Sequence, residues 1–200
     1  MPQASARLHQ ALRESPLLSR FLDRFDAVAL PDAWLVAGCL AQTVWNLAFG
    51  FPAEAGIGDI DLIYHDPADL SEATEAAHAL RLQRSFADIP IRLDVKNQAR
   101  VHIWYERRFG RPILPHASSA AAIATFPATA TSLGVRPARD GLDIVAPYGL
   151  DDLFALVVRP NKILVTQAVY EAKAARWRQH WPGLTIIPWN GHEAHKGESP

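Results

Sequence analysis

The segment Asp59-Ile60-Asp61-Leu62-Ile63-Tyr64 constrains the fold of this chain more than any other. Successive side chains of a strand point to opposite faces, so the alternation predicts one apolar face and one face that carries both aspartates. Asp59 and Asp61 then lie roughly 7 Å apart, where two partly shielded carboxylates disfavour each other's ionisation. A bound divalent cation would relieve that repulsion. The alternative is a strand edge that faces solvent, where aspartates are simply tolerated.

A second alternating segment, residues 91–96, places a third carboxylate on the polar face of a strand. Asp94 shares that face with Arg92 and Lys96, and the residues between them are apolar. If this strand pairs beside the first, three carboxylates converge with basic side chains around them. Carboxylate oxygens suit hard cations such as Mg²⁺ and cationic side chains suit phosphates. The two strands together therefore predict metal-assisted phosphoryl or nucleotidyl transfer.

Strand and helix patterns alternate along the chain, which predicts an α/β (α+β) fold with a mixed sheet and flanking helices. Short strands are expected at 33–37, 59–64 and 91–96, with a further strand around 83–87 and an edge strand at 142–145. Helices are expected over 5–25 with an interruption at Ser15-Pro16, over 40–49, after Asp69 or Ser71, over 97–108, from Ser118-Ser119 through Phe126, from about Gly149 and over 162–181.

One domain is expected to span residues 1–189. Within it we place a catalytic core at about 30–110 and a mainly helical C-terminal portion at 111–189, followed by a flexible tail at 190–200. Alanine, serine, threonine and proline become frequent after Gly110, which marks the change between the two portions.

The composition limits the classes of function. A net charge of −1 argues against a broadly basic surface that coats nucleic acid, although it leaves room for a local basic patch. The single cysteine, Cys39, excludes an internal disulfide and any zinc site that needs several cysteines. No apolar run approaches the length of about 18 residues that a membrane span needs, and no signal-peptide pattern opens the sequence. We therefore expect no membrane partner and a cytoplasmic location.

Gly38 and Cys39 follow the first buried strand and precede a helix. Backbone N–H groups at a helix N-terminus bind anions, so this turn is a candidate phosphate site, although a glycine after a strand is often only a turn residue. Cys39 has two other interpretations. It could be a nucleophile activated by the helix N-terminus, or a small buried side chain, and the absence of an accompanying histidine favours the buried side chain.

Basic residues continue past the third carboxylate. Lys96 and Arg100 are candidates to hold nucleotide phosphates, against the plain alternative of a solvated strand end. In the segment 100–111, arginines alternate with aromatic residues. Such a segment could bind a nucleic acid through its charge and through base stacking. We favour the simpler interpretation, in which the aromatic residues pack into the core and the arginines lie on the solvent-exposed face.

At this point the chain resembles the DNA polymerase β-like nucleotidyltransferase superfamily, and within it a bacterial family of uncharacterised nucleotidyltransferase-like proteins. The resemblance spans about residues 20–185. The segments that carry it are Val44-Trp45, 59–66, 94–102, Phe126-Pro127, Ala130-Thr131, 134–136 and 149–154.

The resemblance implies that Asp59, Asp61 and Asp94 form a carboxylate triad that binds two Mg²⁺ ions, with Mn²⁺ as the alternative ion. It also implies that Gly38 and the residue after it form the triphosphate-binding turn. The chain departs from the superfamily at Cys39, where glycine or serine is usual, and in the long interval between Gly38 and Asp59.

The first functional hypothesis is therefore an Mg²⁺-dependent nucleotidyltransferase. It would move a nucleoside monophosphate from an NTP to the hydroxyl of an unknown acceptor and release pyrophosphate. The alternative is a nucleotide-binding or regulatory protein on the same fold that does not turn over. A metal phosphohydrolase also fits the carboxylates, but the histidine–aspartate ligand pairs expected of it are missing. The sequence leaves the choice of NTP and the oligomeric state open.

Overall fold

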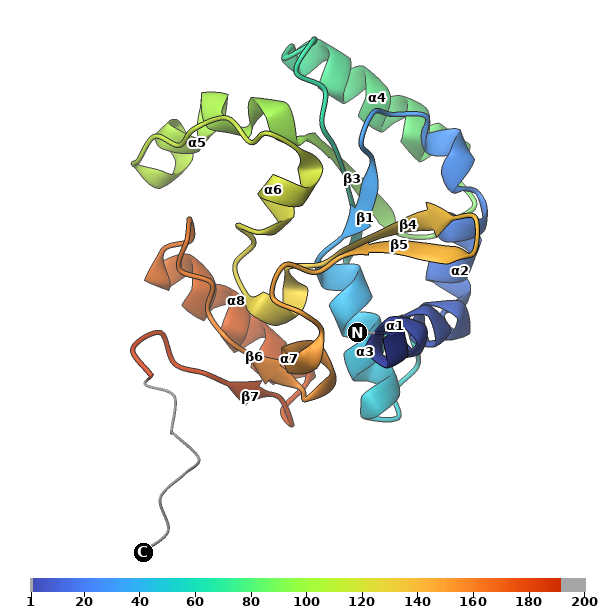
Figure 1. The fold of residues 1–200 in the computed structure, drawn as a ribbon, viewed down its shortest axis with the longest axis vertical. Coiled ribbons are helices and arrows are strands. Elements are labelled where there is room, and N and C mark those ends of the chain that lie inside the picture. The colour runs from blue at the N-terminus through green and yellow to red at the C-terminus, as the bar shows by residue number, and fades with distance from the viewer. Residues whose placement is uncertain (1, 192–200) are drawn as a thin grey trace, which may run out of the picture.

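The computed structural model describes residues 2–191, which are built around a five-stranded mixed sheet (Figure 1). Its strands are β1 (Trp34–Val36), β2 (Asp59–Tyr64), β3 (Arg92–Asn97), β4 (Gly134–Ala138) and β5 (Gly141–Val145). They lie side by side in the order β3-β2-β1-β4-β5. β2 and β3 are parallel, whereas the other neighbouring pairs are antiparallel. The predicted mixed α/β fold is confirmed.

Helices flank this sheet. They are α1 (Pro2–Glu14), α2 (Pro16–Asp23), α3 (Gly38–Ala48), α4 (Glu72–Ser85), α5 (Val101–Phe109), α6 (Ser119–Ile123), α7 (Asp151–Phe154) and α8 (Gln167–His180). Short 3₁₀ turns η1 (Phe25–Val28), η2 (Gln98–Arg100) and η3 (Thr129–Thr131) and a parallel strand pair, β6 (Val157–Val158) and β7 (Thr185–Ile186), complete the described chain. In Figure 1, α5 and α8 lie on one side of the sheet strands and α2 and α4 on the other.

Serine caps mark the start of several helices, including the helix that the sequence predicts to start at Pro16 and the one predicted to follow Asp69 or Ser71. The Ser15 hydroxyl accepts a hydrogen bond from Leu18 N at 3.2 Å, and Pro16 occupies the first helical position of α2. The Ser71 hydroxyl accepts from Thr74 N at 3.2 Å at the start of α4. Each cap satisfies a backbone N–H that the helix itself leaves unpaired.

The register of the central strands places the acidic residues on one face of the sheet. Asp61 lies opposite Asp94 across the parallel pair of β2 and β3. The intervening residues of β2 are buried in the main core, whereas Asp59 and Asp61 share the other face with Ile63. Ile63 is covered by Ile123 of α6. The two aspartates therefore lie beyond the end of the apolar cover.

Three tryptophans join α3 to the end of α8. Trp45 of α3 is fully buried and meets the rings of Trp177 and Trp181 edge-on, with centroid distances of 5.8 and 5.5 Å. Trp181 Nε1 donates to Asn46 Oδ1 at 2.7 Å, and the Asn46 amide donates to two carbonyls of the loop 50–58. We call Trp45, Trp177 and Trp181 the tryptophan joint. It holds α8 at a fixed place relative to α3.

Two of the predicted elements are wrong. Residues 83–87 form the end of α4 and its cap rather than a strand, because Leu82 and Phe86, four residues apart, are both buried on one helical face. The final helix begins at Gln167 and not near Lys162. Its N-cap is Thr166, whose hydroxyl accepts from Val169 N.

Strand β4 is absent from the sequence prediction, although it pairs with β1 at the centre of the sheet. Gly134 gives this segment the pattern of a turn. A Cβ at that position would lie 2.7 Å from Ile123 Cδ1, so the glycine allows α6 to approach the strand. Residues 192–200, most of the predicted tail, lie outside the part of the chain that is described.

Candidate active site

A cleft of about 630 Å³ opens where the polar ends of the central strands meet. Asp59 and Asp61 of β2 and Asp94 of β3 line it. Because β1 is antiparallel to β2, the turn from β1 into α3 lies beside the start of β2, and Gly38 lines the same cleft. A Cβ at Gly38 would be 3.9 Å from Asp61 Oδ2. The structure therefore brings together all three predicted carboxylates and the glycine of the predicted phosphate turn.

The turn before α3 has an unusual backbone. Ala37 has φ 60° and ψ −123°, a conformation that costs free energy for any residue except glycine. Its N–H donates to Leu133 O at 3.0 Å, and α3 begins with the next residue. Through this bend the chain leaves the sheet so that the N-terminus of an 11-residue helix lies at the cleft. Strain of this kind is typical of functional turns.

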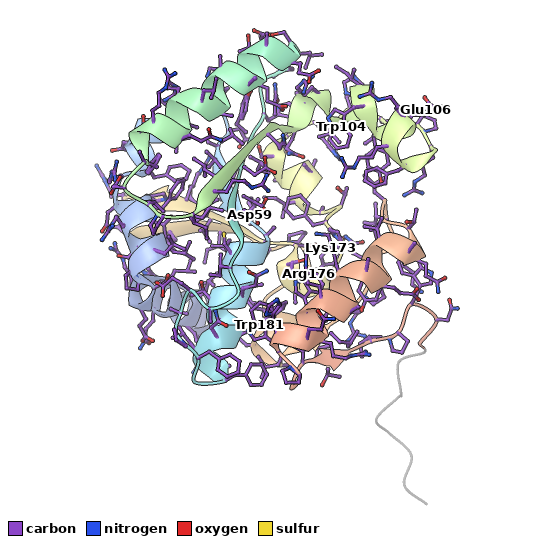
Figure 2. The ribbon with its side chains drawn as sticks, turned by 180° about the vertical axis from the view of Figure 1, so that it is seen from behind. Asp59, Trp104, Glu106, Lys173, Arg176 and Trp181 are labelled. Carbon is purple, nitrogen blue, oxygen red and sulfur yellow. The ribbon has the colours of Figure 1, made fainter. Side chains whose placement is uncertain are left out.

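The wall of the cleft opposite the sheet is formed by α8. Figure 2 shows Lys173 and Arg176 on this helix, across the cleft from Asp59. Both residues line the cleft, and the electrostatic influence of Lys173 reaches Asp61. The cleft thus has a negative wall on the sheet and a positive wall on the helix.

Burial and charge both act on the central carboxyl group. Burial, followed by the charges of Asp59 and Asp94, raises the pKa of Asp61 to about 7 from its ordinary value of 3.8. Burial, followed by the neighbouring Arg176, lowers the pKa of Lys173. The negative charge at Asp61 is therefore only partly compensated by the side chains around it.

The outer two carboxylates are held by basic neighbours. Arg92 Nη2 donates to Asp59 Oδ2 at 2.6 Å, and Lys96 Nζ lies 3.5 Å from Asp94 Oδ1. In this arrangement no group of three or more acidic, histidine or cysteine side chains within residues 2–191 is placed to hold a metal ion. The donor atoms are nevertheless those that Mg²⁺ prefers, and they come from adjacent strands in register.

Comparison with known proteins agrees with this geometry. The sequence profile of the nucleotidyltransferase family matches residues 23–186. The chain belongs to this family. A solved structure described as a CCA-adding enzyme head domain is 26% identical, with a TM-score of 0.74, and the match covers 90% of this chain and 94% of that one. A search of curated proteins gives no match.

Family and fold together confirm the predicted resemblance and support a nucleotidyltransferase, an enzyme class that takes an NTP and an acceptor. None of the helices formed by residues 2–191 combines the length and hydropathy that a membrane crossing requires.

The other predicted phosphate ligands lie at different distances from the carboxylates of this nucleotidyltransferase. Lys96 is beside Asp94, in a second cavity that adjoins the cleft. Arg100 lies elsewhere. Its guanidinium is buried and donates to Glu75 Oε1 at 2.8 Å, and it does not line the cleft. Arg100 thus holds η2 against α4 and has its charge already paired.

Cys39 is at the helix start, as predicted, but its side chain points into the core. The residue is 1% exposed, and its thiol donates to Val36 O at 3.5 Å. Burial raises the pKa of the thiol well above its usual range, which opposes a nucleophilic thiolate. Only the backbone of Cys39 remains available to a ligand in the cleft.

Sequence reasoning missed the cations of α8. Lys173 and Arg176 lie about 80 residues or more from Asp94 in the chain, and only the fold brings them opposite the carboxylates. One signal was present. Lys173, Arg176 and His180 are spaced at i, i+3 and i+7, which places three basic or titratable side chains on one helical face.

Proposed function

We propose that this protein transfers a nucleoside monophosphate from an NTP to an acceptor hydroxyl and releases pyrophosphate. One observation carries the proposal. Asp61 lies opposite Asp94 on adjacent strands, and both line the cleft whose far wall holds Lys173 and Arg176. Sites of phosphoryl transfer need carboxylates that bind metal ions and cationic side chains that bind phosphates.

Asp59, Asp61 and Asp94 are the proposed ligands of Mg²⁺, for which two ions are expected and Mn²⁺ is the alternative. Such ions neutralise charge on the phosphates and lower the pKa of a bound hydroxyl. The raised pKa of Asp61 supports this assignment, because a bound cation would offset both of its causes, burial first and then the negative charges of Asp59 and Asp94. Arg92 and Lys96 each pair with one oxygen of these carboxylates, and we expect bound cations to weaken both ion pairs.

The chain's own residues have separate proposed tasks. The backbone N–H groups of Gly38 and Cys39, at the N-terminus of α3, bind the triphosphate. Lys173 and Arg176 bind it from the opposite wall and stabilise the negative charge of the departing pyrophosphate.

Asp94 accepts the proton of the acceptor hydroxyl. The acceptor oxygen forms a bond to the α-phosphorus while the bond from that phosphorus to the oxygen bridging to the β-phosphate breaks. The use of an NTP is consistent with the cytoplasmic location proposed from the sequence.

The test uses each of the four NTPs, labelled at the α-phosphate, with Mg²⁺ and pooled cell-extract acceptors. Products are analysed by mass spectrometry for a nucleotidyl adduct and for pyrophosphate. Asp59→Asn, Asp61→Asn and Asp94→Asn should each abolish transfer while circular dichroism shows an intact fold. Asp140→Asn, in the exposed turn between β4 and β5, is the control and should remain active. Normal activity in any of the three variants removes that residue from the mechanism.

A nucleotide-binding protein without turnover is the second candidate. The ion pairs of Asp59 with Arg92 and of Asp94 with Lys96 favour it, because they occupy two of the three carboxylates. NTP binding that depends on Asp61, without release of pyrophosphate in the presence of any acceptor, would establish this alternative. Release of inorganic phosphate alone would point instead to a phosphohydrolase.

A further inference from the structure

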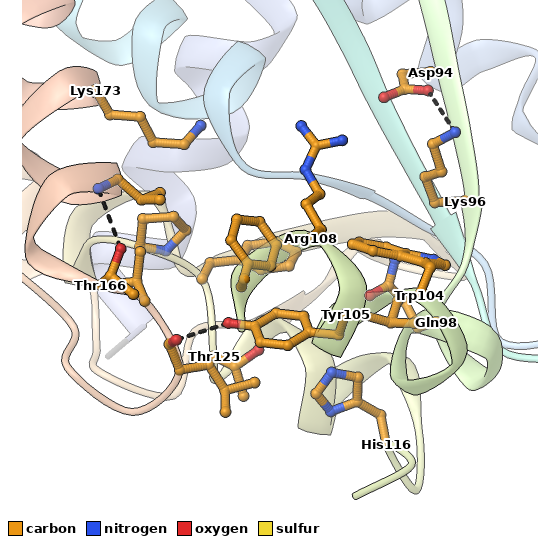
Figure 3. Close-up of a pocket in the computed structure, with 17 residues that line it drawn as sticks. Asp94, Lys96, Gln98, Trp104, Tyr105, Arg108, His116, Thr125, Thr166 and Lys173 are labelled. Atoms are coloured by element: carbon orange, nitrogen blue, oxygen red, sulfur yellow. Dashed lines mark hydrogen bonds and ion pairs between the residues drawn. The ribbon is translucent and has the colours of Figure 1, made fainter. Parts of the chain in front are cut away.

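A second cavity, of about 380 Å³, adjoins the cleft on the side of Asp94. Its walls are aromatic. They include Trp104, Tyr105 and Phe109 of α5, with Phe126 beyond the end of α6. Figure 3 shows the Trp104 and Tyr105 rings in this cavity and the charged ends of Lys96, Arg108 and Lys173 along the edge where Asp94 lies. The volume is that of a pocket for a small organic molecule.

The two cavities share Pro127 and three charged residues, and the rest of their lining differs. Asp94, Arg108 and Lys173 line both. Of the proposed triphosphate-binding residues, Gly38 and Arg176 line only the cleft, and Lys173 lies at the boundary between the two cavities. A molecule in the aromatic cavity therefore approaches the reaction centre from the side of Asp94, the proposed proton acceptor. On the proposed function, on which this inference rests, that is the side of the acceptor.

Gln98 provides an unused polar group in the aromatic cavity. The residue is 8% exposed and lines the cavity, yet its side-chain amide makes no hydrogen bond to any other part of residues 2–191. The backbone on either side of Gln98 is held, because the neighbouring Asn97 Oδ1 accepts from Ala99 N at 3.0 Å and from Asp66 N at 3.1 Å. An amide has two donor hydrogens and one acceptor oxygen, and in Gln98 these atoms are open to the solvent of the cavity rather than sealed in the core. This amide is thus positioned for a ligand.

Most of the remaining polar groups of the cavity are already hydrogen-bonded within the protein or carry no charge. Tyr105 Oη donates to Leu164 O at 2.7 Å. The Thr125 hydroxyl donates to Ala122 O. Burial and two nearby histidines lower the pKa of His116, so the ring is neutral at pH 7. Away from its charged edge, the cavity therefore offers flat apolar walls and one amide that carries a donor beside an acceptor.

We propose that this cavity binds the heteroaromatic ring of the acceptor, with the ring against Trp104 and its donor–acceptor edge paired with the Gln98 amide. The acceptor hydroxyl then lies at Asp94. The class of acceptor is a nucleoside or a similar nitrogen heterocycle that carries a hydroxyl group. A nucleobase fits both features, since every base has a face for stacking and an edge with a donor or acceptor for an amide.

The experiment measures binding separately from transfer. Metal-free protein is titrated by calorimetry with adenosine, guanosine, cytidine and uridine, and with single-stranded tetranucleotides that end in each base. At least one base is expected to bind in one of these forms. Tighter binding of the nucleoside identifies a free small molecule as the source, and tighter binding of the tetranucleotide identifies a strand end.

Two variants test the cavity. Gln98→Leu keeps the size of the side chain and removes the amide, and it should weaken the binding of that base roughly tenfold. Trp104→Leu should also weaken it roughly tenfold, through lost stacking. Gln179→Leu, on the exposed face of α8, is the matched control and should bind as the wild type does. Binding of inorganic tripolyphosphate with Mg²⁺, which probes the cleft, should be unchanged in all three variants.

The inference is overturned if no base binds in either form, or if Gln98→Leu and Trp104→Leu both bind as tightly as the control. It is also overturned if, in the transfer assay, Gln98→Leu raises the KM for the NTP and leaves the KM for the acceptor unchanged. That result would place the donor's base in the cavity. Failure of the proposed function is a separate result, namely no transfer by a protein that still binds Mg²⁺-tripolyphosphate and a base.

Discussion

Replacing Asp61 with asparagine should stabilise the metal-free protein at neutral to alkaline pH. The rise in the pKa of Asp61 from 3.8 to about 7 corresponds, at about 1.4 kcal/mol per pKa unit, to about 4 kcal/mol of lost stability once the group is ionised. Water reaches part of the residue and screens its charge, so we expect about 2 kcal/mol to be recovered in Asp61→Asn. In a domain of this size that is a rise in Tm of roughly 4–8 °C.

The sign of the pH dependence follows from the direction of the pKa change. The folded protein holds the Asp61 proton more tightly than the unfolded chain, so the contribution of Asp61 to stability is fully present below its ordinary pKa of 3.8 and is lost as the pH rises through about 7. The free energy of unfolding of Asp61→Asn should not show this decrease. Urea unfolding at pH 5 and pH 8, with EDTA present, measures the effect, and Asp140→Asn in the exposed β4–β5 turn is the control. Parallel profiles for wild type and Asp61→Asn would refute the reasoning.

The same variant should lose its response to Mg²⁺. For a dissociation constant of about 1 mM, about 10 mM Mg²⁺ stabilises the folded state by RT ln 11, or about 1.4 kcal/mol. That raises the Tm of the wild type by roughly 3–5 °C. Asp61→Asn removes one ligand and should show little of this rise. An undiminished Mg²⁺ effect would contradict the proposed metal site.

The remaining predictions concern single side chains. Lys173→Met should weaken the binding of Mg²⁺-NTP roughly tenfold in calorimetry, because a charge-assisted contact in a partly buried cleft is lost. An unchanged affinity would remove Lys173 from the site. Glu75→Gln should lower the free energy of unfolding in urea by about 3 kcal/mol, since it leaves the buried Arg100 with only the exposed Glu72, 3.8 Å away, as a counter-charge. A change below the scatter of the measurement would show that this pair is dispensable. Cys39→Ser should fold and keep its turnover, whereas loss of turnover with the fold intact would favour a catalytic thiol.

The carboxylate strands could be predicted from the sequence because their signal is local. Alternation of apolar and acidic residues fixes the face of each side chain, and β2 begins and ends where that pattern does. The partner strand β3 shows the same alternation, so the meeting of Asp61 and Asp94 required only that the two strands pair. The helix starts at Pro16 and Ser71 are equally local, since a cap and its first turn lie within four residues.

The parts of the fold and of the site that the sequence did not predict depend on contacts between distant parts of the chain. β4 carries Gly134 and Pro137, which weaken any strand pattern, and its place beside β1 is decided by packing against α6. The positive wall of the cleft depends on where α8 lies, and the tryptophan joint determines that position. For Arg100, a local sequence position suggests a role that a distant contact argues against. Its place after Asp94 in the sequence suggests a phosphate ligand, but Glu75, 25 positions earlier, already pairs with it.

The order of the strands has a consequence for synthesis of the protein on the ribosome. β1 is made early, yet one of its two neighbours is β4, about 100 residues later in the chain. A nascent chain that has only reached Gly110 can pair β1 with β2 and β2 with β3, and it leaves the other edge of β1 open. An open edge can pair with another chain. Lys173, Arg176 and Trp181 leave the ribosome later still, so the carboxylates are translated well before the cations that face them. A chain stopped at Gly110 would carry the whole acidic wall, an open edge on β1 and none of the α8 wall, and we expect it to aggregate rather than to bind nucleotide.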